Sequence, residues 1–488
     1  MEWVIANMAP LMFGALVLFL LFGYPVAFAL AANGIVFGLI GIELGLLQPA
    51  LFQALPERIF GIMANDTLLA IPFFTFMGLI LERSGMAEDL LDTIGQLFGP
   101  LRGGLAYAVI FVGALLAATT GVVAASVISM GLISLPIMLR YGYDKRLASG
   151  VIAASGTLAQ IIPPSLVLII MADQLGKSVG DMYEGAFIPG LTLTALYVIY
   201  VFIVSMIRPA SCPALPPEAR TLHGIKLLMR VLTTLLPPLI LIFLVLGTIF
   251  LGIATPTEGG AMGATGALIL AIARRRLSFK LLKQAMETTG KLTSFVVFIL
   301  VGSTVFSLVF RGVNGDLWVE HLLLGLPGGQ IGFLIVVNIL VFVLAFFLDF
   351  FELSFIVVPL LGPVAEKLGI DLIWFGVLLG VNMQTSFMHP PFGFALFYLR
   401  SVAPASIKTT DIYWGAIPFV CIQVIMVAIV IAFPGIVSYG DPTERERIEQ
   451  NQDVDLGSLM QQGGMSGDSG EQKDPGADLL KNLQQDEK

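Results

Sequence analysis

The distribution of apolar residues along the chain predicts a membrane protein built entirely of helices. Runs of about 20 mainly apolar residues, the length that crosses the hydrocarbon core, recur through the first 434 positions. Windows of this kind lie at 10–29, 32–47, 66–82, 147–172, 187–207, 231–253, 258–273, 291–310, 371–400 and 413–434. Three mixed stretches between them, 48–65, 86–100 and 277–290, are expected to form amphipathic interfacial helices or connecting arms.

Two further apolar stretches, 103–139 and 330–369, are too long for one crossing. Each has about 36 to 40 residues, enough for two helices, and each is interrupted near its middle. The interruptions are Ala118-Thr119-Thr120-Gly121 followed by Ala124-Ala125-Ser126 in the first, and Asp349-Phe350-Phe351-Glu352 in the second. The pattern predicts two re-entrant helical hairpins, each of which enters the membrane and returns to the same side.

The basic residues support this topology. Arg102 and the clusters at 140–146, 208–230 and 274–283 all lie between apolar windows. If 103–139 is re-entrant and every other window crosses once, they share one side, which the positive-inside rule makes cytoplasmic. The second hairpin then opens to the periplasm, and both termini lie outside.

A double proline interrupts one span in each half of the chain. Pro163-Pro164 lies in 147–172, and Pro390-Pro391 lies in 371–400. Proline removes an amide donor and clashes with the carbonyl four residues back, so the backbone opens within the membrane. Because the two hairpins open to opposite sides, the halves are predicted to be inverted copies, an arrangement typical of secondary transporters.

The predicted organisation has six parts. They are the N-terminal scaffold helices and arm (1–100), the first repeat of a transport domain (101–186), further scaffold helices with a connecting arm (187–290), the second repeat (291–400), a last span (401–438) and an acidic, disordered tail (439–488).

Composition and charge narrow the class of protein. With 57% hydrophobic and only 12% charged residues among 488, the chain is not a soluble multidomain enzyme. Of the net charge of −8, −7 lies in the tail from Asp441 onward, and no clustered basic face points to nucleic acid. The sequence has neither GxxxxGK[ST] nor HExxH, which disfavours ATP-driven transport and metalloprotease chemistry. Cys212 and Cys421 are predicted to be buried apolar groups without a disulfide.

Candidate binding residues gather at the hairpin tips and the two breaks. Free carbonyls with hydroxyls suit Na⁺, and amides at the start of a half-helix suit a carboxylate. The candidates are Thr119, Thr120, Gly121, Ser126, Ser155, Gly156, Thr157, Pro163, Pro164, Asp349, Glu352, Asn382, Gln384, Thr385, Ser386, His389, Pro390 and Pro391. The competing interpretation of each break is a kinked packing helix whose hydroxyls bond back to the backbone.

Three of these candidates are ionisable. An acid inside the membrane is a functional candidate by default, so Asp349 is the predicted cation ligand. Glu352 either belongs to the same site, pairs with a basic residue or reaches periplasmic water. His389 is either a structural residue or a proton carrier or substrate contact.

Four segments resemble the large membrane subunit (M subunit) of tripartite ATP-independent periplasmic (TRAP) transporters. They are Ile71-Pro72-Phe73-Phe74 with Gly78, Ser155 to Ser165, Ala254-Thr255-Pro256-Thr257-Glu258, and Asn382 to Phe397. The resemblance covers nearly all of 10–434. It implies an all-α polytopic membrane protein, an inverted-repeat elevator-type transporter with two re-entrant hairpins and two broken helices, in a bacterial or archaeal inner membrane.

The resemblance also implies partners and site roles. It implies Na⁺ as coupling ion with no organic cofactor, a small membrane subunit (Q type), and a periplasmic substrate-binding protein (P type) that delivers an organic anion. One Na⁺ would lie between the 119–126 tip and Gly156-Thr157, and a second between Asp349 and Thr385-Ser386. His389 stands where the family commonly has Thr. The local sequences at 349–352 and 392–394 are similar to those of a branch associated with mannitol, chloroaromatic or 2-oxo acid substrates.

Other functions remain open at this level. A single-component Na⁺/dicarboxylate or ion symporter would share the inverted architecture but need no partner. A membrane-embedded enzyme would require Asp349, Glu352 and His389 to converge on one cavity. A passive channel would not accumulate substrate against a gradient.

Overall fold

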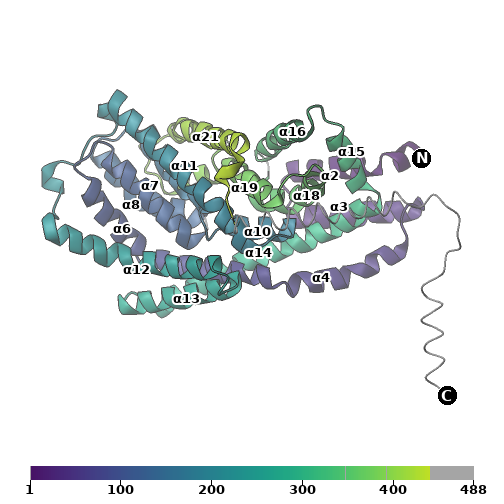
Figure 1. Ribbon diagram of the computed structural model, residues 1–488, viewed down its shortest axis with the longest axis horizontal. Coiled ribbons are helices and arrows are strands. Elements are labelled where there is room, and N and C mark those ends of the chain that lie inside the picture. Colours follow the sequence, from purple (N-terminus) through teal and green to yellow (C-terminus); the bar gives the residue numbers. More distant parts are fainter. Residues whose placement is uncertain (1, 122, 347, 392, 440–488) are drawn as a thin grey trace, which may run out of the picture. The chain divides into compact units, whose positions relative to one another are not determined.

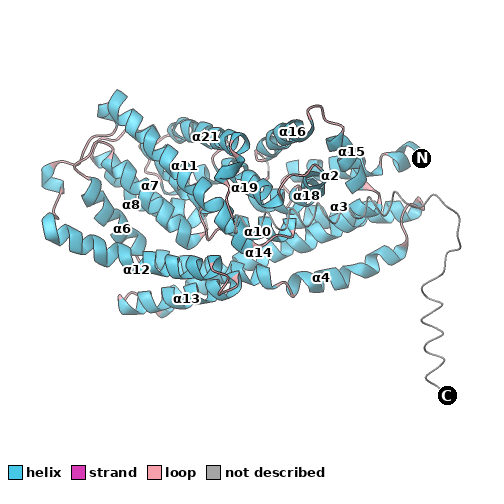
Figure 2. Ribbon diagram, viewed as in Figure 1, coloured by secondary structure: helices cyan, strands magenta, loops and turns pink. Residues whose placement is uncertain are grey.

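The computed structural model describes residues 2–121, 123–346, 348–391 and 393–439, and every regular element in these ranges is a helix (Figures 1 and 2). Six of the described helices are long and apolar enough to cross a membrane alone, and two bent helix pairs raise this number to eight. The predicted multi-pass, all-helical fold is therefore confirmed. The predicted tail lies outside the described residues from position 440 onward.

The first half runs through the first predicted hairpin and the first predicted break. Its elements are α1 (Glu2–Ala6), α2 (Met8–Leu21), α3 (Val26–Glu43), η1 (Pro49–Ala54), α4 (Leu55–Met63), η2 (Asp66–Leu69), α5 (Ala70–Arg83), α6 (Met86–Phe98), α7 (Gly104–Thr120), α8 (Val123–Arg140), α9 (Lys145–Thr157), η3 (Leu158–Gln160), α10 (Leu166–Leu175) and α11 (Val179–Ile207).

The second half again contains paired helices followed by a broken helix. Its elements are η4 (Pro209–Ser211), η5 (Pro217–Ala219), α12 (Gly224–Phe250), α13 (Pro256–Ala273), α14 (Phe279–Gly312), α15 (Gly315–Leu324), α16 (Gly329–Leu344), α17 (Phe350–Ile356), α18 (Val358–Lys367), α19 (Leu372–Met383), η6 (Gln384–Phe387), α20 (Phe394–Val402), α21 (Thr409–Ala432) and η7 (Pro434–Ile436).

Two expectations about helix boundaries are wrong. The window 10–29 is divided, because α2 ends at Leu21 and the chain turns through Gly23, at φ +77°, before Pro25 opens α3. The predicted arm 277–290 is not separate: α14 runs unbroken from Phe279 to Gly312, so the arm and the following span form one helix. Apolar content marks where a helix can enter lipid, but it does not mark where a helix ends.

Helices α12 and α13 are joined by a cation that compensates for two prolines. Pro237 and Pro238 lie inside α12, where a proline cannot donate to the carbonyl four residues back. The freed carbonyls are those of Thr233 and Thr234, and the guanidinium of Arg274 donates to both, at 2.9 and 3.5 Å. Arg274 follows the last residue of α13, so a residue outside α12 restores the hydrogen bonding that its prolines remove.

Helices α9 and α21 approach each other at a pair of glycines. A Cβ added to Gly150 would lie 2.1 Å from the carbonyl oxygen of Gly415, and one added to Gly415 would lie 2.2 Å from that of Arg146. Only glycine allows this backbone contact. The last span is thereby packed tightly against the helix that leads into the first break.

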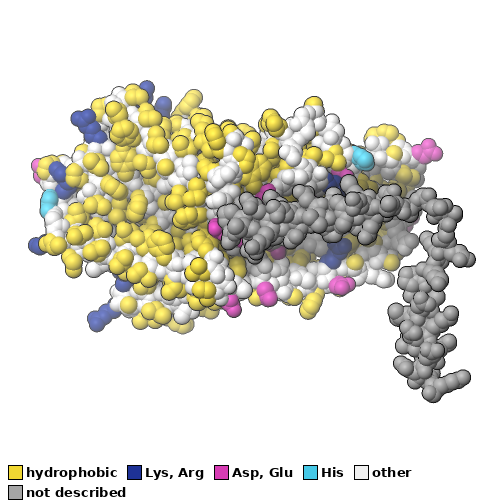
Figure 3. Space-filling model, in the orientation of Figure 1, with side chains coloured by type: hydrophobic (Ala, Val, Ile, Leu, Met, Phe, Trp, Pro, Cys, Tyr) yellow, Lys and Arg dark blue, Asp and Glu magenta, His cyan; other side chains and the backbone are white. Residues whose placement is uncertain are grey.

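Many large apolar side chains of the described residues are exposed, as a lipid-facing surface requires. Figure 3 shows apolar side chains across much of the visible face, while Lys and Arg gather at the end where α11 stops and α12 begins. Cys421 is exposed, contrary to the expectation of burial, whereas Cys212 is buried.

Candidate functional site

The first broken helix opens where the double proline predicts. Helix α9 ends at Thr157, a 3₁₀ turn follows, and α10 begins only at Leu166. The hydroxyl of Ser165 donates to the carbonyl of Gln160 at 2.6 Å and accepts from the amide of Val167 at 3.2 Å. Ser165 therefore caps α10 and closes the open segment 161–165 on itself.

The second broken helix has the same order of elements. Helix α19 ends at Met383, one 3₁₀ turn leads to Phe387, and α20 begins at Phe394. Both Pro163-Pro164 and Pro390-Pro391 contain a cis peptide bond. Both predicted breaks are confirmed, and the two share one local architecture.

A buried hydrogen bond links the two breaks. The amide nitrogen of Gln384 donates to the hydroxyl oxygen of Thr157 at 3.1 Å, and that hydroxyl donates to the carbonyl of Ala154 at 2.8 Å. Gln423 on α21 also donates to Thr157, at 3.4 Å, and to the hydroxyl of Tyr197 at 3.0 Å. Gln423 was not among the predicted residues, and its only signal in the sequence is an amide within an apolar window.

The tip of the first predicted hairpin lies against the first break. Gly121 ends α7 at φ +57°, a left-handed conformation that favours glycine. A Cβ at Gly121 would lie 3.4 Å from both the carbonyl oxygen of Pro164 and the side chain of Leu166. The side chains of Thr119 and Thr120 lie outside the described part of the chain.

The two acids of the second tip form a capping box. Asp349 precedes α17 and accepts from the amide of Glu352 at 2.9 Å, while Glu352 accepts from the amide of Asp349 at 3.0 Å. This reciprocal pair satisfies amides at the start of α17. Glu352 has no basic partner among the described ion pairs, so the alternative of a salt bridge finds no support in these residues.

A cavity of about 390 Å³ is lined by residues of both tips and both breaks. The tips contribute Gly121, Val123, Ala124 and Asp349 to Glu352, and the breaks contribute Gln160, Leu166, Phe387 and Phe394. Leu292 and Phe295 of α14 and Tyr398 of α20 complete the lining. Five segments that are separated in the sequence therefore share one space.

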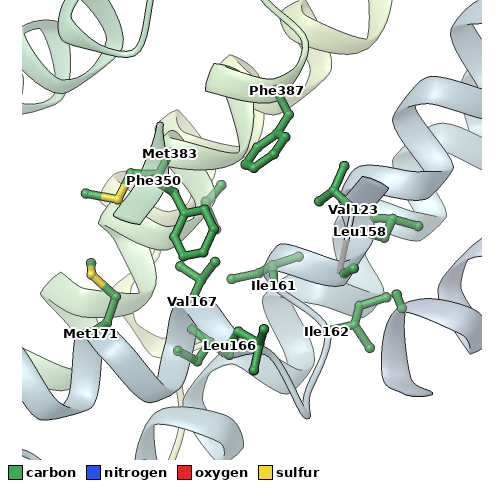
Figure 4. Close-up of a cluster of buried hydrophobic side chains, with 14 of the residues drawn as sticks. Val123, Leu158, Ile161, Ile162, Leu166, Val167, Met171, Phe350, Met383 and Phe387 are labelled. Carbon is green, nitrogen blue, oxygen red and sulfur yellow. The ribbon is translucent and has the colours of Figure 1, made fainter. Parts of the chain in front are cut away.

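The walls of this cavity are mostly apolar. Figure 4 shows Phe350 and Phe387 over the first break, where Ile161 and Val167 lie. Phe350 contacts Phe351 and Phe387 ring to ring. An apolar enclosure lowers the local dielectric, which strengthens the few polar interactions that the cavity offers.

Three helices of ten, nine and eighteen residues begin at the cavity. Leu166 starts α10, Phe394 starts α20 and Val123 starts α8, and all three residues line the cavity. The positive end of each helix dipole therefore faces the same space. No Lys, Arg or His is among the described residues that line it.

Oxygen ligands for a monovalent cation are present at the same cavity. The amide oxygen of Gln160 is buried and has no partner among the described residues, and Asp349 contributes a carboxylate. The Pro164 carbonyl lies beside Gly121. Carboxylate and amide oxygens are hard ligands, the type that suits Na⁺. The described residues hold no group of three or more His, Cys, Asp or Glu for a transition metal.

Several predicted residues are engaged outside this cavity. Asn382 donates to the carbonyl and the side-chain oxygen of Asn338, at 2.8 and 2.9 Å, and Thr385 donates to the carbonyl of Asn382. Gly156 packs against Val127: a Cβ added to Gly156 would lie 2.3 Å from the Val127 side chain. The hydroxyl oxygens of Ser155 and Ser386 are buried without a partner among the described residues. The Na⁺ sites predicted with Gly156-Thr157 and with Thr385-Ser386 remain predictions.

His389 occupies an aromatic slot. Its ring lies 4.3 Å from Phe342 and 4.3 Å from Phe346, stacked on the latter, and it is only 1% exposed. Neither ring nitrogen makes a well-formed hydrogen bond within the described residues, although the ring approaches the backbone of Ala345. His389 does not line the cavity with Asp349 and Glu352, so the three ionisable candidates do not form one acid–base set.

An all-helical, multi-pass membrane protein with two broken helices around one internal cavity is the class that this fold defines. The chain belongs to the family of the DctM component of tripartite ATP-independent periplasmic transporters, whose family model matches residues 13–436. It is thus a large permease of the TRAP type, and its relatives are transporter permeases rather than enzymes.

Individual relatives agree with this assignment. The chain is 30% identical to the C4-dicarboxylate TRAP transporter large permease protein DctM of Pseudomonas aeruginosa, over 80% of this chain and 90% of the relative. It is 28% identical to the sialic acid large permease SiaM of Vibrio cholerae, over 84% and 93%. It is also 28% identical to the isethionate permease DctMQ of Oleidesulfovibrio alaskensis, over 82% and 61%.

A solved structure shares the fold. The YdaH transporter of Alcanivorax borkumensis matches with a TM-score of 0.56 and 14% sequence identity, covering 79% of this chain and 88% of that one. At this identity the match speaks for the fold alone.

Proposed function

We propose that this chain is the permease of a Na⁺-coupled system that imports an organic anion of the carboxylate or 2-oxo acid type by an elevator movement. The observation that carries the proposal is the cavity of about 390 Å³, where both tips and both breaks meet. Substrate and coupling-ion sites of inverted-repeat transporters lie at the repeat interface, among discontinuous helices.

The anion is held by helix termini rather than by a basic side chain. With no cationic side chain among the described lining residues, the amides at the starts of α8, α10 and α20 supply the positive potential. The aromatic wall of Phe350, Phe351 and Phe387 then accommodates the carbon skeleton.

In this proposal, the positive charge of Na⁺ offsets the negative charges of Asp349 and Glu352. Asp349 and Glu352 line the cavity, so an anionic substrate would face two carboxylates without compensation. Na⁺ bound by Asp349 and the Gln160 amide oxygen removes this repulsion, which makes substrate binding depend on the ion. In the proposed mechanism only the fully loaded or the empty transport domain moves, because partial loading leaves uncompensated charge in an apolar passage.

In the proposed elevator movement, the predicted transport domain moves and the predicted scaffold stays fixed. The two hairpins, α7–α8 and α16–α18, travel with the broken helices, and α11–α13 with the N-terminal helices form the scaffold. A small membrane subunit binds the scaffold, and a periplasmic binding protein delivers the substrate. The fused name DctMQ of the isethionate relative is in line with a close association of two membrane components.

Uptake into proteoliposomes tests the proposal. The permease is reconstituted with its small subunit and binding protein, and accumulation of a labelled carboxylate is measured under an inward Na⁺ gradient and under an equal K⁺ gradient. Accumulation only with Na⁺ and only with the binding protein is expected. Equal accumulation in K⁺ would refute Na⁺ coupling, and accumulation without the binding protein would favour the single-component symporter.

A further inference from the structure

A second cavity, of about 500 Å³, lies apart from the proposed transport site. It is bounded by the end of α11, the start of α9 and the first turns of α21, and its lining includes Arg146, Arg208 and Trp414. All three segments belong to the side that the distribution of basic residues predicts to be cytoplasmic.

The cavity presents cationic groups that the protein itself only partly neutralises. Arg208 has no ion-pair partner among the described residues, and Arg146 has only a loose one, Asp411, at 3.8 Å, with 59% of the Arg146 side chain exposed. The lining acid, Asp144, accepts the amides of Arg146 and Leu147 through Oδ1 as the cap of α9. An exposed pair of this kind contributes little, so the guanidinium groups remain available to an anion.

The same cavity continues onto apolar surface. Ile203 and Ile207, both in the lining, are 46% and 72% exposed, and Trp414 is 59% exposed. These residues lie at the ends of predicted spans, where tryptophan marks the membrane–water interface. A soluble anion would use only the arginines, whereas a lipid also covers the apolar wall.

We propose that this cavity binds an anionic phospholipid of the cytoplasmic leaflet, with the phosphate between Arg146 and Arg208 and the acyl chains along Ile203 and Ile207. Basic pockets between membrane helices on the cytoplasmic side are suited to anionic headgroups. The proposal concerns a structural site and does not depend on Na⁺ coupling or on the identity of the substrate.

Fluorescence quenching by brominated lipid tests the site. In the full chain, Trp3, Trp318 and Trp374 are replaced by Phe so that Trp414 is the only tryptophan, which is excited selectively over tyrosine. The protein is reconstituted in mixtures of phosphatidylglycerol and phosphatidylcholine, one of which is brominated. The relative affinity of the two lipids at Trp414 is read from the quenching. Phosphatidylglycerol is expected to be preferred. Arg208→Gln should reduce this preference about fivefold, and Arg146→Gln/Arg208→Gln should reduce it further.

The controls separate the possible occupants. Arg275→Gln removes an exposed cation on the same predicted side but outside the cavity, and should leave the preference unchanged. Glycerophosphoglycerol, which is phosphatidylglycerol without its acyl chains, should not displace the brominated lipid. Equal quenching by both lipids, an unchanged preference in the double variant, or displacement by glycerophosphoglycerol would each overturn the proposal.

Discussion

The side-chain amide of Gln384 donates a hydrogen bond to the hydroxyl of Thr157 across 227 positions of sequence. Thr157 is the last residue of α9, and Gln384 directly follows α19, so this bond joins the two broken helices at the points where they open. Because both side chains are fully buried, neither can exchange its partner for water. The two halves of the site are therefore held in register by groups that are costly to leave unpaired.

Removing either partner of this bond should destabilise the protein. Thr157→Val and Gln384→Leu are each expected to lower the stability by about 1–3 kcal/mol, and the double variant to lose less than the sum. Thermal unfolding in detergent measures both effects. Thr192→Val, at a half-buried position where the hydroxyl bonds back to the carbonyl of Ile188, is the matched control. Additive losses would show that the bond does not couple the breaks.

Asp349→Asn should weaken the dependence of uptake on Na⁺. The variant keeps an oxygen but loses the negative charge, and the Na⁺ concentration for half-maximal uptake is expected to rise about tenfold, equivalent to about 1.4 kcal/mol. Asp316→Asn, an exposed acid of α15, controls for the loss of one charge. An unchanged Na⁺ titration of the Asp349 variant would remove this residue from the ion site.

A crosslink between α5 and α8 should stop transport. The hydroxyl of Ser129 donates to Glu82 at 2.7 Å, so the predicted scaffold and the predicted moving hairpin touch here. In a chain with Cys212→Ala and Cys421→Ala, Glu82→Cys/Ser129→Cys is expected to lose uptake on treatment with a short bifunctional methanethiosulfonate, which spans the gap left by the long Glu82 side chain, and to regain it on reduction. Uptake by each single cysteine variant should not change with the crosslinker. Full uptake by the crosslinked protein would contradict a sliding movement at this contact.

Gly150→Ala should destabilise the packing of α9 on α21. The added methyl would lie 2.1 Å from the Gly415 carbonyl, and overpacking of this kind costs about 1–3 kcal/mol. Gly14→Ala, inside α2 with nothing within 4 Å of the new Cβ, should instead be neutral or stabilise by about 0.5–1 kcal/mol through helix propensity. A lower Tm for the first variant only is the expected result.

The breaks could be predicted because two local signals coincide there: a double proline, and small or polar residues directly before it. At Pro163-Pro164 and Pro390-Pro391 the helix opens. The double proline alone is not sufficient, since α12 continues through Pro237-Pro238, where Arg274 donates to the freed carbonyls. The acids at 349 and 352 were equally visible as charges in an apolar run. Their reciprocal bonds to the amides of α17 also follow a local pattern, the capping box.

The partners that meet at the site could not be predicted in the same way. The contributions of Gln160, Tyr398 and α14 to the cavity depend on long-range packing, as does the approach of Gln423 to Thr157. Hydropathy also failed where a turn lies inside an apolar run, as at Gly23, and where a polar stretch continues a helix, as in α14.

The bonds from Arg274 to the Thr233 and Thr234 carbonyls have a mechanical consequence. Separating α13 from α12 would leave the two carbonyls freed by Pro237 and Pro238 without their donor. Arg274 and Arg276 also both pair with Asp89 of α6, at 3.6 and 3.1 Å. Bending in one of these helices is therefore passed to the other two. A partner that binds α12 and exerts a force on it therefore has to bend α6, α12 and α13 together, which is harder than bending α12 alone.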